Sequence, residues 1–430
     1  MGRLTVSENK RTLLKNNKPF FYLADTCWSA FTNIRENDWI EYLRKRKYQG
    51  FNTLQINILA QWDRSASSLD YLPFASDENG KFDFSKLKDD YFEHAKRYVT
   101  LAHQAGFELS LVVLWSNYVS GTWASELATK IGKADNIFPQ EYLEQYFAKV
   151  IETFDEFQPI YVIGGDTDFI TDVATQTYLR AFDYFSVHSP ETLKTIHVKG
   201  RFTEIPTEIE KLQDLYFYQS GHNSEHFEMP YLLAEDFYKK KPQLPIVNSE
   251  PCYEQMGYSR NVYGRFTRFD IRKAAWQSVL SGACAGLTYG AHGIWSWQES
   301  NSSFSSEIGE AFDVPVTWME ALNFLGATDY GFIRQFLEFN GLSNLVPAQD
   351  LLVNADPSIR VARDAEQGWV LVYLPSNTSI KLDEDFSNAA ISLIDLENNH
   401  FFKPEYQVED GKTVFSIHNA AADVLLIIKR

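Results

Sequence analysis

Eight short apolar stretches between residues 20 and 289 limit the folds open to this chain more than any other feature. Several are continuous apolar runs, which is typical of strands buried on both faces. Segments with helical spacing lie between them, for example residues 142–157. The stretches are residues 20–25, 52–57, 108–114, 160–163, 195–198, 215–218, 245–248 and 286–289. Eight strands with intervening helices predict an α/β fold, a closed (β/α)8 TIM barrel.

The segments outside this pattern predict a hairpin before the barrel and a second domain after it. Residues 4–6 and 12–14 flank a polar stretch. The longest connection between strands, residues 61–88, is rich in Ser, Asp and Gly, as expected of a loop insertion. From about residue 345, short apolar runs alternate with turn signals, the pattern of an all-β sandwich. We therefore expect residues 1–344 to form the barrel with its hairpin, and residues 345–430 a small β-sandwich.

Two carboxylates directly follow predicted barrel strands. Asp166 comes after the fourth strand in Gly164-Gly165-Asp166, and Glu250 after the seventh in Asn248-Ser249-Glu250-Pro251. The carboxyl ends of all barrel strands meet at one face. There, one carboxyl can protonate the leaving oxygen of a glycoside while the other attacks the anomeric carbon or activates water. We therefore predict Asp166 and Glu250 as catalytic residues, because neighbours can tune two carboxyl pKa values in opposite directions.

Each carboxylate also has a structural interpretation. Asp166 could cap a helix or hold a turn after the two glycines. Asp168 is an equally good cap and a rival for the acid role. Glu250, which follows a strand and precedes a proline, could form a salt bridge at the barrel mouth.

Other polar and aromatic side chains near strand ends form a candidate sugar-binding set. Hydrogen-bonding groups and flat rings around one face suit a polyhydroxylated substrate, so an oligosaccharide or glycoside is the expected partner. For any one member, a supporting hydrogen bond in the core is the alternative. The set is Asp25, Trp28, Gln55, Asn57, Trp115, His197, Gln219, His222, Tyr289, His292, Trp295 and Trp297.

Charge and motifs argue against other classes of protein. The 40 Lys and Arg against 57 Asp and Glu give a net charge of −17, which disfavours nucleic acid or an anionic membrane surface as partner. The nearest metal-like pair, His222 and His226, lacks the internal Glu of zinc proteases, so we predict no metal and no cofactor. No apolar signal-peptide core or membrane-spanning run is seen, so we expect a cytoplasmic protein.

Several segments together resemble one family of glycoside hydrolases. They are residues 21–28, 164–166, 218–222 and 248–251, with residues 272–276 and 290–297 similar to its end-of-barrel segment. The chain resembles the apiosidase-like group, glycoside hydrolase family 140, over about residues 10–345. The tail resembles a β-sandwich described in that group as collagen-binding.

This resemblance implies a clan A barrel that hydrolyses with retention. It implies Asp166 as acid/base after strand four and Glu250 as nucleophile after strand seven, although clan A more often has Asn-Glu where Gly165-Asp166 stands here. It also implies apiose-containing pectic side chains as substrates. The sequence thus predicts a retaining glycoside hydrolase of plant-type oligosaccharides. A non-catalytic carbohydrate-binding or adhesion protein on a barrel scaffold, and a transglycosidase, are the alternatives.

Overall fold

The computed structural model describes residues 2–130, 136–259, 262–304, 312–418, 420 and 422–430. Within these ranges, parallel strands form an eight-stranded sheet in the order β10-β9-β8-β5-β4-β13-β12-β11. A parallel bridge from His197, just after β10, to Phe217 of β11 joins the two ends of the sheet into a ring. The predicted (β/α)8 TIM barrel is confirmed, and every predicted stretch overlaps one of these strands. They are β4 (Tyr22–Thr26), β5 (Thr53–Asn57), β8 (Glu108–Trp115), β9 (Ile160–Gly165), β10 (Lys194–Thr195), β11 (Tyr216–Tyr218), β12 (Ile246–Asn248) and β13 (Gly286–Tyr289).

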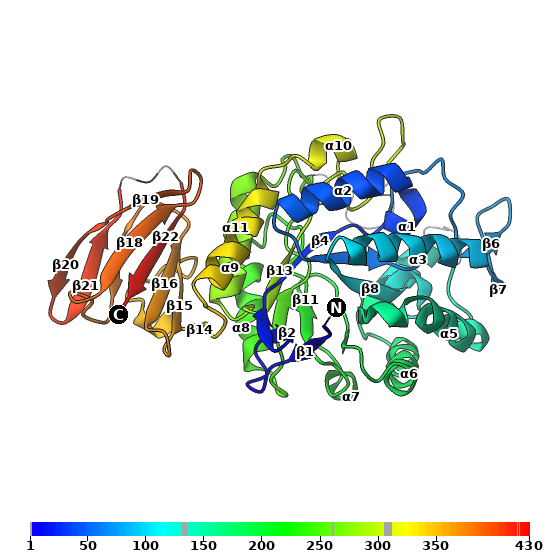
Figure 1. Cartoon of the computed structure of the whole chain (residues 1–430), viewed down its shortest axis with the longest axis horizontal. Coiled ribbons are helices and arrows are strands. Elements are labelled where there is room, and N and C mark those ends of the chain that lie inside the picture. The colour runs from blue at the N-terminus through cyan, green and yellow to red at the C-terminus, as the bar shows by residue number, and fades with distance from the viewer. Residues whose placement is uncertain (1, 131–135, 260–261, 305–311, 419, 421) are drawn as a thin grey trace.

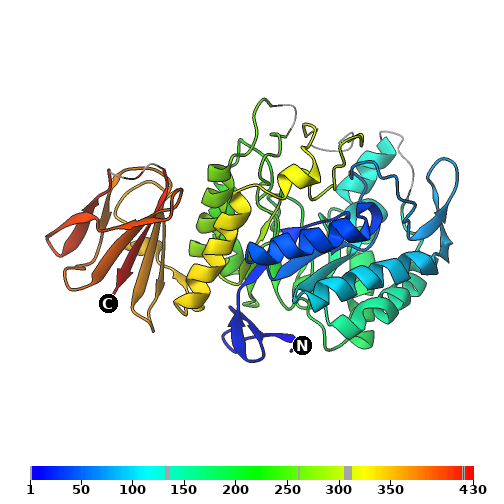
Figure 2. The ribbon, with the colours of Figure 1, turned by 45° about the horizontal axis from the view of Figure 1, so that its top comes forward.

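Amphipathic helices cover the outside of the barrel (Figures 1 and 2). In α5 (Leu143–Phe154), Leu143, Phe147, Val150 and Phe154 recur every three or four residues and are buried, so one apolar stripe faces the sheet. None of the helices in the described ranges combines the length and hydrophobicity needed to cross a bilayer. The others on the outside are α2 (Glu36–Tyr48), α3 (Asp89–Gln104), α6 (Asp172–His188), α8 (Met229–Lys239), α9 (Arg268–Leu280) and α11 (Gly326–Phe339).

Shorter elements lie before the barrel and in its connections. The N-terminal segment is a three-stranded antiparallel sheet, one strand more than the predicted hairpin: β1 (Leu4–Val6), β2 (Leu13–Lys15) and β3 (Lys18–Phe20). The long connection after β5 holds the hairpin β6 (Phe74–Ser76) and β7 (Phe82–Leu87). The remaining short helices are α1 (Ala30–Asn33), η1 (Ser116–Tyr118), α4 (Trp123–Lys130), η2 (Gln140–Tyr142), η3 (Asp155–Phe157), α7 (Thr207–Glu210) and α10 (Trp318–Ala321).

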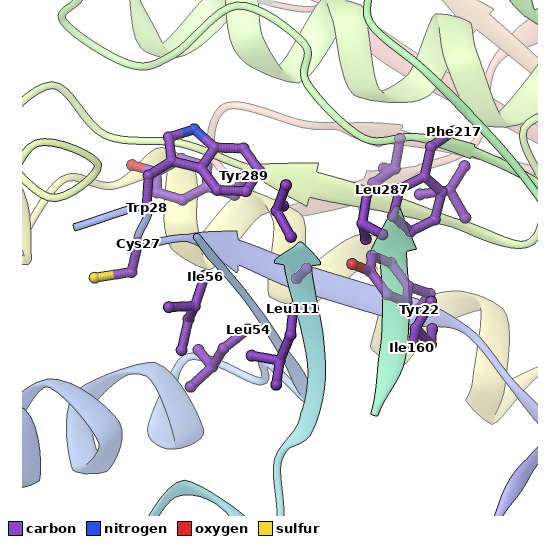
Figure 3. Packing of buried hydrophobic residues seen from close by; sticks show 14 of the residues in the cluster. Tyr22, Cys27, Trp28, Leu54, Ile56, Leu111, Ile160, Phe217, Leu287 and Tyr289 are labelled. Atoms are coloured by element: carbon purple, nitrogen blue, oxygen red, sulfur yellow. The ribbon is translucent and has the colours of Figure 1, made fainter. Parts of the chain in front are cut away.

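The barrel interior is filled by side chains of several strands. Tyr22 of β4 lies edge-on to Phe217 of β11 with ring centroids 5.5 Å apart, beside Leu287 of β13 (Figure 3). The Tyr22 hydroxyl reaches Oε1 of Gln55 at 2.9 Å, so this ring is fully buried without an unpaired polar atom. The filled interior makes the barrel a rigid support for the loops at its carboxyl end.

The C-terminal residues form two antiparallel sheets that share a second, smaller core. This confirms the expected β-sandwich, while the division between residues 344 and 345 stays a prediction. One sheet has the order β14-β15-β16-β22-β18-β19 and the other β17-β21-β20. The elements are β14 (Val346–Pro347), η4 (Gln349–Leu351), β15 (Arg360–Asp364), β16 (Trp369–Leu374), β17 (Ser379–Leu382), β18 (Ala390–Asp395), β19 (His400–Phe402), β20 (Glu405–Glu409), β21 (Lys412–Ser416) and β22 (Val424–Lys429).

The sandwich lies beside α9 of the barrel (Figure 1). Buried charges join the two domains there. Arg272 of α9 forms ion pairs with Asp423, next to β22, and with Asp329 of α11. The hydroxyl of Tyr373 donates to Oδ2 of Asp423 at 3.0 Å. Arg360 of β15 makes a second link, to α8 and to the residue after α9. The carboxylates of this network compensate the cost of burying Arg272.

Removing Asp423 should destabilise the protein strongly. Asp423→Ala takes away one of the two carboxylates that compensate the buried Arg272 guanidinium, and breaking such a pair costs about 3–5 kcal/mol. The free energy of unfolding can be measured by urea denaturation followed by circular dichroism. In the control Asp383→Ala, which removes the partner of the partly exposed Lys412, the loss should be about 0–1 kcal/mol. Equal losses in the two variants would contradict this account of the interface.

Candidate active site

A pocket of about 290 Å³ lies at the carboxyl ends of the barrel strands. Every barrel strand contributes at least one lining residue, from its last position or from the loop after it, which is where barrel enzymes carry their active sites. The lining combines carboxylates, cations, amides and a large share of aromatic rings. It consists of Trp28, Gln61, Trp62, Asp63, Trp115, Trp123, Asp166, Lys199, Gly200, Arg201, Gln219, Gly221, His222, Asn223, Glu250, Tyr253, Met256, Trp295 and Phe312.

The two glycines before Asp166 are required by crowding at the end of β9. A Cβ atom on Gly164 would collide with the ring of Tyr178, and one on Gly165 with the ring of Trp115. Asp166 itself has a left-handed backbone with φ of 47°, a conformation that Asp tolerates better than most residues. The indole Nε1 of Trp123 donates to the backbone carbonyl oxygen of Asp166 at 2.7 Å. This turn ends the strand and sets Asp166 in the wall of the pocket.

The surroundings of Asp166 favour its protonated form. Burial, the first cause, together with the negative charges of Glu250 and Asp63, raises the pKa of Asp166 well above its ordinary value. The cation of Lys199 opposes this shift without cancelling it. A carboxyl that keeps its proton in this way is suited to act as a general acid.

Asp168, the rival from the sequence, has a different environment. It is fully buried, and its carboxylate accepts hydrogen bonds from Nζ of Lys199 at 2.6 Å and from the backbone N–H of Trp123 at 3.3 Å. It is not part of the pocket lining. Its contacts are those of a residue that holds the loops after β8 and β10 together.

Glu250 has the opposite electrostatic environment to Asp166. It follows β12 by two residues, and two imidazole rings converge on it. Nε2 of His222 lies 2.7 Å from Oε1, and Nε2 of His197 lies 3.1 Å from Oε2. Burial by itself raises the pKa of Glu250, but the contacts with His197 and His222 outweigh it and lower the pKa to about 2. Glu250 is therefore held as a carboxylate.

The ring of His197 is fixed from its other side. The hydroxyl oxygen of Ser249 lies 2.8 Å from Nδ1 of His197 and 3.0 Å from the carbonyl oxygen of Tyr218. Nε2 of His197 is thereby directed at Glu250.

Among the described residues, no group of three or more His, Cys, Asp or Glu is arranged to hold a metal ion.

Aromatic rings supply the apolar part of the pocket wall. Trp28 and Trp115 meet edge to face with ring centroids 4.9 Å apart. Trp62 and Trp123 form a second pair at 6.0 Å. Flat rings of this kind pack against the C–H faces of sugars, while the carboxylates and amides bind hydroxyl groups.

The residues predicted from the sequence separate into three groups. Seven line the pocket: Asp166, Glu250, Trp28, Trp115, Gln219, His222 and Trp295. His197 lies behind Glu250 and contacts it without being part of the lining. The structure does not bring the other six to the pocket wall: Asp25, Gln55, Asn57, Tyr289, His292 and Trp297.

Three of these six have partners inside the barrel wall. Asp25 is fully buried and accepts from Nε of Arg46 at 2.6 Å, on the helix side of the sheet. Tyr289 donates to Glu254 at 2.6 Å. Trp297, in the loop after β13, is fully buried and stacks on Trp318 with ring centroids 4.7 Å apart. Successive residues of a strand point to opposite faces, and Asp25 in β4 and Tyr289 in β13 occupy positions that point away from the pocket.

The other three of the six contact a lining residue, or the neighbour of one, from behind. Gln55 donates to the carbonyl oxygen of Ser249 at 3.0 Å, and Asn57 donates to Gln61 at 2.8 Å. Nδ1 of His292 accepts from the indole of Trp295 at 3.1 Å. Burial lowers the pKa of His292 to about 4, which keeps Nδ1 free to accept.

Several lining residues were not predicted from the sequence. Asp63 and Trp62 lie in the polar insertion after β5, and Lys199 and Arg201 lie beyond the end of β10. Tyr253 follows Glu250 by three residues, and its hydroxyl accepts from Nε1 of Trp28 at 3.2 Å. Lys199 directly follows the predicted strand at residues 195–198 and could have been selected on that ground, whereas the others lie farther from a strand end, where strand counting gives no signal.

Comparisons with known proteins give a family match and solved structures that share the fold. A family model described as "Apiosidase-like, catalytic domain" matches residues 7–343, and a search among curated proteins gives no match. A solved structure described as "Glycoside hydrolase" is 20% identical, with a TM-score of 0.78 over 100% of this chain and 97% of that one. A glycoside hydrolase family 5 protein from Bacteroides vulgatus ATCC 8482 is 20% identical, with a TM-score of 0.80 over 100% and 93%. At these identities the solved structures show a shared fold.

Adding one methyl group at Gly165 should disturb the site. In Gly165→Ala the new Cβ meets the Trp115 ring, so either the ring or the end of β9 must move, at a cost of about 1–3 kcal/mol. The free energy of unfolding and the near-ultraviolet circular dichroism of the tryptophans would report this. Gly200→Ala is the control, because its Cβ would have no neighbour closer than 3.8 Å. A stability equal to that of the control would contradict the crowding at β9.

Proposed function

Because the chain belongs to the apiosidase-like family of glycoside hydrolases, we propose that it is a retaining enzyme in which Glu250 is the nucleophile and Asp166 the acid and base. The family match confirms the resemblance drawn from the sequence. It also favours an enzyme over a non-catalytic sugar-binding protein. The retaining mechanism, the roles of the two carboxyls and the identity of the sugar are proposals.

One observation carries the mechanism: Asp166 and Glu250 line the same pocket, and their pKa values are shifted in opposite directions. Burial and nearby negative charge favour a protonated Asp166. The contacts from His197 and His222 favour an ionised Glu250. A pair with one proton donor and one carboxylate is what the first step of a retaining glycosidase requires.

In the first step, an oxygen of Glu250 attacks the anomeric carbon as the bond to the leaving oxygen breaks. The proton of Asp166 goes to that leaving oxygen, so the departing group is a neutral alcohol. A covalent glycosyl ester on Glu250 and an ionised Asp166 result. His197 and His222, which contact the two oxygens of Glu250, orient the carboxylate for this attack.

In the second step, Asp166 takes a proton from water as that water attacks the anomeric carbon. The ester bond to Glu250 breaks, and the carboxylate regains its charge beside the two histidines. Since the anomeric carbon is attacked twice from opposite sides, its configuration is retained. The histidines stabilise Glu250 as a leaving group in this step, because they favour its anionic form.

The family favours plant-type oligosaccharides, with apiose-containing glycosides as the first candidates. A panel of aryl glycosides and plant oligosaccharides identifies the sugar, and NMR of the first product formed reveals its anomeric configuration. Inversion of that configuration would rule out the double displacement. A cytoplasmic location remains a prediction from the sequence.

Replacing the nucleophile should abolish turnover. In Glu250→Gln the side chain keeps its shape but loses the charge that attacks the anomeric carbon. We expect normal folding and a loss of about 10²–10⁴-fold or more in kcat on an activated aryl glycoside. The exposed Glu204→Gln is the matched control and should retain full activity. Near-wild-type activity of Glu250→Gln would remove Glu250 from the mechanism.

Replacing the acid should affect substrates according to their leaving groups. Asp166→Ala should slow glycosides with poor leaving groups by about 10²–10⁴-fold and activated ones less in the first step, because good leaving groups need no proton. Azide should restore part of the activity by attacking the glycosyl ester in place of water. Asp168→Ala should lower stability, through the loss of the Lys199 pair, and should show no azide rescue. Rescue of Asp168→Ala alone would move the acid role to Asp168.

A further inference from the structure

A third carboxylate, Asp63, lines the pocket and has no part in the two-carboxylate reaction. It lies in the connection between β5 and β6 and is partly buried. The negative charge of Glu250 acts on Asp63, and that of Asp63 acts on Asp166. It therefore lies near both proposed catalytic groups, beside the position where a sugar would bind.

Asp63 is held in place by a chain of amides that starts in the barrel wall. Asn57, the last residue of β5, donates from Nδ2 to Oε1 of Gln61 at 2.8 Å. Nε2 of Gln61 in turn donates to Oδ1 of Asp63 at 2.8 Å. Asn57 and Gln61 are both buried. A side chain supported in this way has a fixed direction, as binding groups in active sites require.

In the part of the chain that the structure describes, no Lys or Arg forms an ion pair with Asp63. The neighbouring Arg64 donates to the carbonyl oxygen of Gln61 at 3.3 Å, and Lys199 pairs with Asp168. Burial, with a further contribution from Glu250, raises the pKa of Asp63 to about 6. A carboxylate in such a place is costly unless hydrogen-bond donors meet it.

We propose that Asp63 is a specificity-determining residue whose carboxylate accepts hydrogen bonds from hydroxyl groups of a neutral sugar bound beside Glu250. Hydroxyl groups are the donors that a sugar offers, and the carboxylates around the pocket disfavour an anionic sugar at this position. The inference rests on the proposed function, since it takes the pocket to be the sugar site. The inference adds to that function a residue, Asp63, that favours a sugar carrying the contacted hydroxyl group over the same sugar without it.

The test measures binding of free sugars to the full-length protein by calorimetry, using neutral aldopentoses and aldohexoses and the monodeoxy form of each sugar that binds. Wild type is compared with Asp63→Asn, with Asp63→Ser as a second replacement, and with Asp70→Asn. Asp70 is an exposed carboxylate of the same connection and serves as the control. Circular dichroism checks the fold of each variant.

We expect at least one sugar to bind wild type and the Asp70 control about 10–100-fold more tightly than the Asp63 variants, the range expected for hydrogen bonds to a charged group. Removing one particular hydroxyl should weaken binding to wild type by a similar factor and binding to Asp63→Asn much less, because contacting groups are not additive. If no sugar binds wild type more tightly than the Asp63 variants, or if every deoxy penalty is unchanged in Asp63→Asn, the inference is overturned.

Because binding is measured without turnover, this result does not depend on which residues cleave the bond. An active Glu250→Gln would overturn the proposed mechanism and leave the Asp63 result intact. Normal turnover of the wild type, together with equal sugar affinities of the wild type and the Asp63 variants, would overturn only the inference about Asp63.

Discussion

The closed ring of parallel strands is the constraint on which the site depends. Because all strands run the same way, the residues that follow them emerge on one face of the barrel, however far apart they are in the sequence. The bridge between His197 and Phe217 completes this ring beside Glu250. His197 therefore has two roles, one through its backbone in closing the barrel and one through its imidazole in contacting the nucleophile.

At the carboxyl end of that ring, one pocket holds a carboxyl group that favours its protonated form and another that favours its ionised form. Glu250 sits among donors, whereas Asp166 sits among apolar groups and other carboxylates. Both environments depend on neighbouring residues. Ser249 directs His197, and crowding by Trp115 requires the glycine that precedes Asp166. The chemistry of the two carboxyls is thus set largely by the residues packed around them.

The strands and the two proposed catalytic positions could be predicted from the sequence because they depend on local pattern. An apolar run followed by a polar residue marks a strand end, and this rule found Asp166 and Glu250. It failed for Asp25 and Tyr289, because the direction in which a strand residue points depends on the tilt and register of the whole barrel. It could not find Asp63, whose position depends on the path of a long connection and on hydrogen bonds to Gln61.

The Arg272 network bears on how this protein could be altered. A domain joined by a flexible linker can be deleted or exchanged as a unit, because few contacts connect it to the neighbouring domain. Here the guanidinium on a barrel helix depends on an aspartate next to the final strand. A shortened version ending after the barrel would leave that cation facing solvent or apolar surface without its second counter-ion. Fusing either domain to a different protein would therefore require redesigning the residues on both sides of this domain interface together.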